Sequence, residues 1–140
     1  MADRVRLLKA ERRLLLFRGE HLLAVYRVAL GSQPEGHKER RGDGRTPEGR
    51  YLLDWRRNQS AFHREIHISY PSPRDRARAA AAGVSPGGGI LIHGLPNGLG
   101  DIGADHAAGD WTDGCVAVTN QEMDEIWQVV PDGTPIEILP

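Results

Sequence analysis

The segment Asp110-Trp111-Thr112-Asp113-Gly114-Cys115-Val116-Ala117-Val118 holds the single cysteine of this 140-residue chain. A lone thiol cannot form an internal disulfide or a multi-cysteine metal site, so it is either a buried bystander or a reactive nucleophile. Thr112-Asp113-Gly114 is typical of a tight polar turn, not of the apolar surroundings of a structural cysteine. Gly114 lets the backbone approach a substrate closely, and its own amide and that of Cys115 can face a developing oxyanion. The pattern favours the nucleophile.

His93 is the histidine best placed to serve such a thiol. It ends the short apolar run Ile90-Leu91-Ile92-His93, which predicts a buried strand, and it precedes Gly94 at the expected sheet edge. A Gly-rich stretch separates it from Cys115 and is long enough to bring the two together. A thiol at its free pKa is only slightly ionised at neutral pH, so a nucleophilic cysteine needs a histidine or another cation beside it. The alternative is a core histidine whose ring nitrogens are satisfied by backbone.

Short apolar runs separated by turn residues predict a mainly β chain with two short helices. One helix is expected over residues 74–82, stopped by Gly83, and another over residues 119–130, opened by the capping box Thr119-Asn120-Gln121-Glu122. Residues 31–47 are rich in Gly, Pro and charge and predict a long surface loop. The strands are expected at residues 5–8, 13–17, 22–30, 51–55, 65–70, 90–93 and 134–139.

Length and composition indicate one soluble globular domain, residues 1–140, with 39% hydrophobic and 26% charged residues. The charged start shows no signal peptide, and no apolar run is long enough to span a membrane. All 18 Lys and Arg fall within residues 1–78, whereas the charged residues within 79–140 are all Asp or Glu. We expect the two halves to interleave and neutralise each other.

A sharper interpretation of the charge is a basic cleft for an anionic polymer. Nucleic acid is not the expected partner, because aromatic residues are few and do not alternate with the basic ones. The basic residues in question are Lys38, Arg40, Arg41, Arg45, Arg56 and Arg57.

Three other patterns do not lead to a site. Residues 98–103 match a dinucleotide-binding fingerprint as a string, but no strand precedes them and no helix follows. His63 and His67 would share one face of a strand and could hold a metal, although ordinary polar positions explain them more simply. His106, with Asp105 and Asp110, is a loop cluster of the same kind. No metal or cofactor is expected.

Four segments, in this order, resemble the L,D-transpeptidase catalytic domain (YkuD) family, in its compact branch with a DWTxGC motif. The resemblance covers nearly the whole chain and implies a mixed, β-sandwich-like fold with the cysteine on a loop in a cleft. The segments are residues 42–51 (GDGRTPEGRY), 68–71 (ISYP), 92–94 (IHG) and 110–118 (DWTDGCVAV).

The resemblance implies that Cys115 is the nucleophile and His93 its base. The carbonyl of Gly94 would orient the imidazole, and the amides of Gly114 and Cys115 would form the oxyanion hole. It further implies a peptidoglycan substrate: the thiol attacks the diaminopimelate–D-alanine amide of a stem tetrapeptide, leaving a thioester for an acceptor amine. Acylation by carbapenems is implied as well. The substrate-contacting residues expected from the same motifs are Tyr70, Trp111, Thr112 and Asp113.

Two residues depart from the commoner family pattern. Asp113 stands where many members have His, and Ala117 stands where many have Arg. An acid near the thiol would raise the pKa of Cys115, and the missing arginine removes a contact for a substrate carboxylate. We predict that Arg45, in the turn Gly42-Asp43-Gly44-Arg45, replaces it.

Three functions are therefore considered. The first is a cysteine acyltransferase of the cell wall. The second is a hydrolase on the same scaffold, acting as a carboxypeptidase or releasing a group linked to a stem peptide. The third is a wall-binding module without catalysis, which the fold alone would permit but which has no need of His93 and Cys115. The substrate would place the protein in the periplasm or cell envelope.

Overall fold

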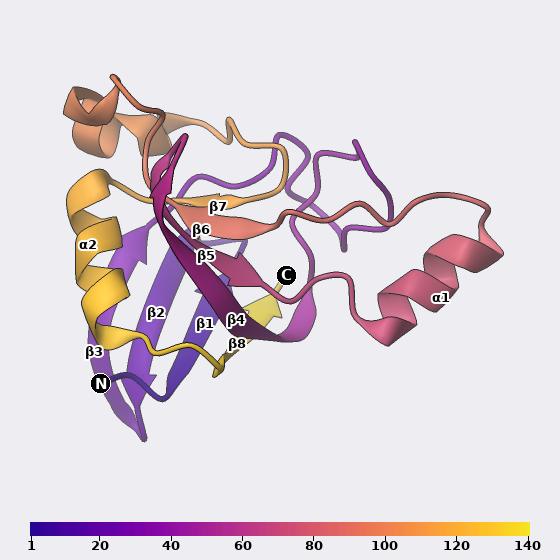
Figure 1. Ribbon diagram of the computed structural model, residues 1–140, viewed down its shortest axis with the longest axis horizontal. Coiled ribbons are helices and arrows are strands. Elements are labelled where there is room, and N and C mark those ends of the chain that lie inside the picture. Colours follow the sequence, from indigo (N-terminus) through magenta and orange to yellow (C-terminus); the bar gives the residue numbers. More distant parts are fainter.

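The computed structural model describes residues 1–140 and is built around one mixed eight-stranded sheet in the order β3-β2-β1-β8-β4-β5-β6-β7 (Figure 1). Three helical segments accompany it: α1 (Pro73–Ala81), α2 (Asn120–Val129) and the 3₁₀ segment η1 (Gly100–Ala108). The strands are β1 (Arg4–Leu8), β2 (Arg13–Arg18), β3 (His21–Arg27), β4 (Gly49–Ser60), β5 (His63–Ile68), β6 (Leu91–His93), β7 (Val116–Ala117) and β8 (Thr134–Leu139).

The sheet curls until its two ends meet. β1 pairs with β8 and β6 pairs with β7 in parallel, and the other neighbours are antiparallel. Ala29, just after the edge strand β3, exchanges backbone hydrogen bonds with Ala117 of the opposite edge strand β7. Gly31 then bridges to Thr112 in the cysteine segment. The predicted mainly β, sandwich-like fold is confirmed, with one curled sheet supplying both layers.

Alternation along the strands builds the core. Val5 and Leu7 of β1, like Leu14 and Leu16 of β2, are fully buried while their neighbours are more exposed, because successive side chains in a strand point to opposite faces. Helix α2 covers this core with Met123 and Ile126. Its capping box, Thr119 with Glu122, forms as the sequence predicts.

Several boundaries differ from the sequence predictions. β4 runs to Ser60, beyond the predicted end at Trp55, because its polar second half pairs with β5 as a projecting ribbon. β3 ends at Arg27, and the next residues form isolated bridges to the cysteine segment. Helix α1 begins one residue earlier than expected, at Pro73, and has its own capping box between Ser72 and Asp75. The two-residue strand β7 and the segment η1 were not predicted.

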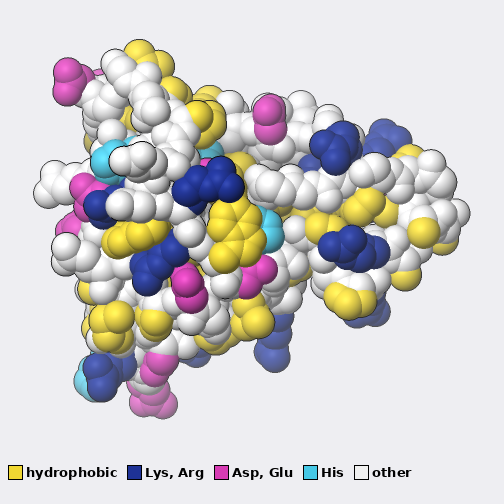
Figure 2. Space-filling view, viewed as in Figure 1, with side chains coloured by type: hydrophobic (Ala, Val, Ile, Leu, Met, Phe, Trp, Pro, Cys, Tyr) yellow, Lys and Arg dark blue, Asp and Glu magenta, His cyan; other side chains and the backbone are white.

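The charges of the two halves do interleave. Ion pairs between the halves join β1 and β4 to β8, the turn after β1 to the cysteine segment, and β5 to α2. In Figure 2, acidic and basic side chains mix over the body of this face, whereas only basic ones show at the α1 end. None of the helices combines the length and the apolar character that crossing a membrane requires.

Candidate active site

Cys115 and His93 lie on the same face of the sheet. His93 is opposite Ala117 in the parallel β6–β7 pair, and residues opposite each other share a face. Cys115 comes two residues before Ala117 and therefore returns to that face. Both side chains line one cleft of about 590 Å³, which the structure forms from segments far apart in sequence. A larger groove of about 790 Å³ lies on the far side of the 39–45 loop and contains neither residue.

His93 is held in one tautomer. Its Nδ1 donates to the carbonyl oxygen of Gly94 at 2.7 Å, so Nε2 carries a lone pair, and no group in the protein bonds to it. The imidazole is buried (3% exposed) against the ring of Phe62, with centroids 4.5 Å apart. Burial lowers the pKa of His93 below its ordinary value, with a smaller contribution from His106. A neutral imidazole with a free nitrogen is a competent general base.

The thiol of Cys115 is neutral in this state. It is partly exposed, and its Sγ donates to the carbonyl oxygen of Gly89 at 3.3 Å instead of to His93. The pKa of Cys115 is raised to about 11, mainly by burial and to a smaller extent by the charges of Asp113 and Glu65. The Leu91 amide and the Lys38 ammonium act in the opposite direction.

The turn before Cys115 is fixed by two threonines. Thr112 Oγ1 accepts from the Gly114 amide at 3.1 Å and donates to the Cys115 carbonyl oxygen at 2.8 Å. Thr46 Oγ1 donates to the Gly114 carbonyl oxygen at 2.8 Å and accepts from the Gly31 amide. Of the two amides expected in the oxyanion hole, that of Cys115 makes no hydrogen bond, whereas that of Gly114 is already bonded to Thr112.

Close packing explains why glycine precedes the cysteine. Gly114 adopts a φ of +131°, and a Cβ there would lie 2.6 Å from the carbonyl oxygen of Arg45. A Cβ on Gly31 would overlap the carbonyl oxygen of Gly44. The cysteine turn, the segment after β3 and the 39–45 loop are therefore in direct backbone contact, with no room for side chains between them.

The 39–45 loop is ordered by one buried ion pair. Lys38 and Asp43 are almost fully buried, and their charged groups are 2.9 Å apart. Asp43 also accepts from the backbone amides of Glu39, Arg40 and Arg45. Burial alone would raise the pKa of Asp43, but these hydrogen bonds lower it to about 2. Lys38 also lines the cleft, so this pair positions the cleft wall and brings a positive charge toward the thiol.

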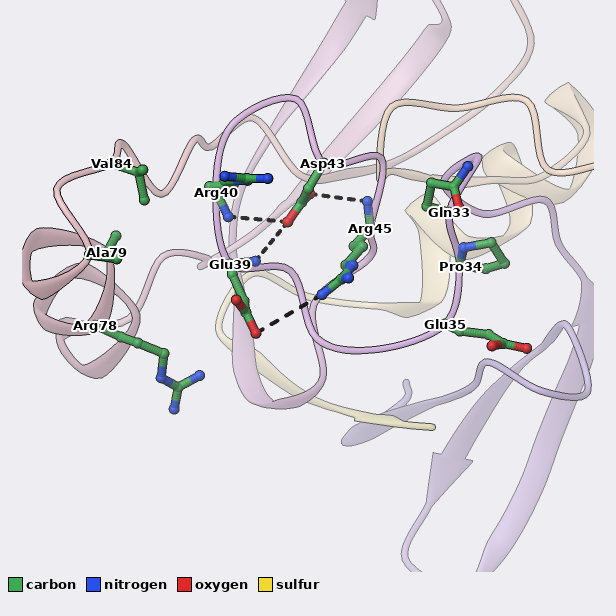
Figure 3. Close-up of a pocket in the computed structure, with 11 residues that line it drawn as sticks. Gln33, Pro34, Glu35, Glu39, Arg40, Asp43, Arg45, Arg78, Ala79 and Val84 are labelled. Atoms are coloured by element: carbon green, nitrogen blue, oxygen red, sulfur yellow. Dashed lines mark hydrogen bonds and ion pairs between the residues drawn. The ribbon is translucent and has the colours of Figure 1, made fainter.

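Two of the predicted substrate-contacting residues do not line the Cys115 cleft. The side chain of Arg45 does not line the Cys115 cleft but turns into the larger groove, where it pairs with Glu39 (Figure 3). Tyr70 is 1% exposed, and its hydroxyl donates to the carbonyl oxygen of Pro86, so it is part of the core. The reason is the same for both: adjacent residues of a motif point to different sides of the backbone, which a string of letters does not show.

Trp111, Thr112 and Asp113 do line the cleft, as expected. Trp111 is exposed and its indole Nε1 faces Nδ1 of the buried His106 at 3.5 Å. The Thr112 hydroxyl bonds to the Gly114 amide and the Cys115 carbonyl oxygen within the turn. Among the basic residues proposed to flank a cleft, Lys38 and Arg41 line it. Arg40 and Arg45 face the groove, Arg56 pairs with Asp132, and Arg57 pairs with Glu65.

Sequence reasoning missed three supporting residues. Thr46 is fully buried and holds the cysteine turn. Asp110 binds the Arg12 guanidinium through two nitrogens and accepts from the Leu30 amide, which ties the cysteine segment to the first hairpin. Asn120 accepts from the Leu95 amide and fills the space beside Gly94. The available signal was that Thr46 and Asp110 lie inside the recognised motifs; nothing marked Asn120.

The metal-binding candidates separate in the structure. His63 bonds to Asp124 of α2, whereas His67 bonds to Asp54 and stacks on Trp55. Asp110 is occupied by Arg12. No three histidine, cysteine or acidic side chains gather as a metal site would require.

Comparison with known proteins places this arrangement in a family. The model of the L,D-transpeptidase catalytic domain (YkuD) matches residues 2–138. YafK of Escherichia coli K12, which carries the provisional name of an L,D-transpeptidase, is 34% identical over 134 residues. That match covers 90% of this chain and 46% of YafK, so the chain spans about half the length of the curated relatives it matches.

Solved structures share the fold. The helical cell shape determining protein Pgp2 of Campylobacter jejuni superimposes with a TM-score of 0.71 at 24% identity, covering 98% of this chain and 47% of Pgp2. Bd1075 of Bdellovibrio bacteriovorus superimposes with a TM-score of 0.64 at 24% identity, covering 96% of this chain and 46% of Bd1075. LdtMt1 in complex with imipenem superimposes with a TM-score of 0.63 at 13% identity, covering 99% of this chain and 59% of LdtMt1. Since the family model spans almost all of a chain whose fold these structures share, the chain belongs to the L,D-transpeptidase catalytic domain (YkuD) family.

Proposed function

We propose that this domain is a cysteine acyltransferase acting on peptidoglycan stem peptides. The observation that carries the proposal is the state of His93: Nδ1 is tied to the Gly94 carbonyl, and Nε2 is free on the same sheet face as Cys115. A general base needs such a free lone pair beside the group that it deprotonates. Family membership supports the proposed substrate class, and the shared cleft supports the pairing of His93 with Cys115.

The chemistry proceeds in two steps. The Sγ proton passes to His93 Nε2, and the thiolate attacks the carbonyl carbon at the L-centre of diaminopimelate in a tetrapeptide stem. The unpaired amide of Cys115 stabilises the oxyanion. The C–N bond breaks, His93 returns the proton to the leaving D-alanine amine, and a thioester remains. An acceptor amine then attacks the thioester, loses its proton to His93, and regenerates the thiol.

The elevated pKa of Cys115 shapes the first step. With a pKa of about 11, the free enzyme holds a neutral thiol beside a neutral imidazole, not a thiolate–imidazolium pair. The substrate must displace the thiol from the Gly89 carbonyl and turn it toward Nε2. Proton transfer and attack are then concerted. This arrangement protects the thiol from unproductive reaction in the absence of substrate.

Hydrolysis on the same scaffold is the second candidate, and one observation favours it. Cys115 is partly exposed, and glycine and polar residues form most of the cleft wall around it. No apolar cover shields a thioester from water in this conformation. Water in place of the amine would yield a carboxypeptidase or release a group linked to the stem peptide.

The proposed substrate places the protein in the periplasm or cell envelope. The complex of LdtMt1 with imipenem supports the further proposal that a carbapenem acylates Cys115. The predicted adduct equals the protein mass plus one intact carbapenem, because opening the β-lactam ring releases no leaving group.

The test is intact-mass spectrometry of the protein incubated with a disaccharide-tetrapeptide, next to the Cys115→Ala variant. We expect a thioacyl adduct, with loss of D-alanine, on the wild type only. Muropeptides from the same sample separate the two activities, because a dimer indicates transfer and a monomeric tripeptide indicates hydrolysis. Neither adduct nor product would leave the wall-binding module as the remaining function.

A further inference from the structure

The larger groove beside the cleft lies between the 39–45 loop and helix α1 (Figure 3). Its volume of about 790 Å³ exceeds that of the Cys115 cleft. The loop is the wall common to both: Lys38, Arg41 and Gly44 face the cleft, whereas Glu39, Arg40 and Arg45 face the groove. The groove is therefore one loop away from the proposed catalytic centre.

The charges in this groove are available to a ligand. Arg78 of α1 and Arg40 have no ion-pair or hydrogen-bonding partner for their guanidinium groups. Arg45 and Glu39 approach only to 4.0 Å, and their side chains are 40% and 60% exposed. Asp43 is different, because its carboxylate is already satisfied by Lys38 and three amides. Besides Asp43, three arginines and two glutamates line the groove, and the contacts that Arg45 makes, with Glu39 and with the His37 carbonyl oxygen, are long.

Their arrangement has both signs within one small space. Figure 3 shows Glu39, Arg45 and Arg78 in the same groove, with Glu39 paired to Arg45. A plain dianion would find attraction from two arginines but repulsion from Glu39. A zwitterion satisfies all three, because its carboxylate can bridge the arginines and its ammonium can pair with Glu39. The loose Arg45–Glu39 pair can open to admit it at little cost.

We propose that the groove binds a free α-amino carboxylate, the zwitterionic head group at the D-centre of the diaminopimelate side chain. This specificity rests on the proposed function, in which diaminopimelate is the residue whose L-centre is acylated. A stem peptide would place its reacting amide in the Cys115 cleft while its side-chain terminus crosses the 39–45 loop. The groove thereby selects stems whose diaminopimelate end is free over stems in which it is cross-linked or amidated.

The experiment is an NMR titration of the Cys115→Ala protein, with the arginine Nε–H resonances as reporters. Three probes share the same central five-carbon segment: meso-diaminopimelate, pimelate, which lacks the amines, and 1,5-diaminopentane, which lacks both carboxylate carbons. We expect meso-diaminopimelate to shift the Arg45 and Arg78 resonances and to bind about fivefold more tightly than either analogue. Equal affinity for meso-diaminopimelate and pimelate would overturn the proposal.

Matched variants identify the groups responsible. Arg78→Ala is expected to weaken binding of meso-diaminopimelate, whereas Arg76→Ala on the same helix, outside the groove, is expected to leave it unchanged. Glu39→Gln is expected to abolish the preference for meso-diaminopimelate over pimelate. Equal weakening by both arginine variants would contradict the site.

This binding is measured without Cys115, so it is independent of acyl transfer. A protein that forms the thioacyl adduct but fails the titration retains the proposed function and loses the groove. A protein that passes the titration but forms no adduct retains the groove as a binding site and loses the proposed function.

Discussion

Two histidines of this domain have opposite arrangements: His93 is buried, and His37 is partly buried. His37, in the 31–47 loop, donates from Nε2 to Asp75 at 2.8 Å and accepts at Nδ1 from the Glu48 amide at 2.8 Å. His93 uses only Nδ1, which donates to a backbone carbonyl, and leaves Nε2 free. By composition, the His37–Asp75 pair resembles a catalytic histidine with its orienting carboxylate more than His93 does.

A free ring nitrogen, not a carboxylate partner, distinguishes His93 of the proposed site from His37. Asp75 also accepts from the Tyr51 hydroxyl at 2.7 Å and from the Ser72 amide, so the His37 cluster clamps α1 against β4 and the loop. Every polar atom there is satisfied, which stabilises structure but leaves no base. A carbonyl partner fixes the tautomer of His93 equally well without adding a negative charge near a thiol whose pKa is already high.

The largest effect is expected from His93→Gln. Loss of the base should lower the rate of D-alanine release by about 10²–10⁴-fold, while the free energy of unfolding changes by less than about 1 kcal/mol. His37→Gln is the matched control and should do the opposite, with lower thermal stability and retained turnover per folded molecule. If both variants kept wild-type turnover, the assignment of His93 as base would be wrong.

The clamp is tested next by Asp75→Asn. The amide keeps the shape of the carboxylate but turns one acceptor into a donor facing groups that already donate, which should cost about 2 kcal/mol. Urea unfolding measures this loss, and the turnover of the folded fraction should stay near that of the wild type. A stability equal to that of the wild type would mean that the cluster is not a clamp.

The two regions should also titrate in different pH ranges. Burial lowers the pKa of His93, so the base form persists and the acid limb of kcat/KM should have its midpoint below 6.5. For Asp75, burial alone would raise the pKa, but hydrogen bonds from Ser72, Tyr51 and His37 lower it below 3.8. A depressed carboxyl pKa stabilises the fold above 3.8, and this contribution is lost as the pH falls through the lowered value. A single midpoint for activity and unfolding would contradict the separation.

The smallest effect is expected from Asp113→Asn in the cleft. Burial is the main cause of the high pKa of Cys115 and remains in the variant, so removing the Asp113 charge should lower that pKa only modestly. Alkylation by iodoacetamide at pH 8 should become roughly two- to fivefold faster. Asp101→Asn, in η1 and away from the cleft, is the control that should change nothing.

The sequence by itself determined most of the fold. Alternating runs such as Val5-Arg6-Leu7-Leu8 and the capping box at Thr119 depend on neighbours in the chain, so local patterns predicted them correctly. Val116–Ala117 escaped prediction because a two-residue strand has no period to detect. The second half of β4, Arg56 to Ser60, was not predicted as strand because a projecting ribbon needs no apolar face and so shows no alternating pattern.

The sequence also singled out Cys115 and His93 as candidates, because a lone cysteine in a glycine turn and a histidine ending a strand are unusual in those places, and the structure brings both to one cleft. Only the tertiary structure decided which way the other side chains point. Arg45 and Tyr70 belong to recognised motifs, yet one faces the neighbouring groove and the other the core. Thr46 and Lys38 acquire their roles from contacts across the curled sheet and the 39–45 loop. Such contacts join residues distant in the chain, and one sequence does not record which distant residues meet.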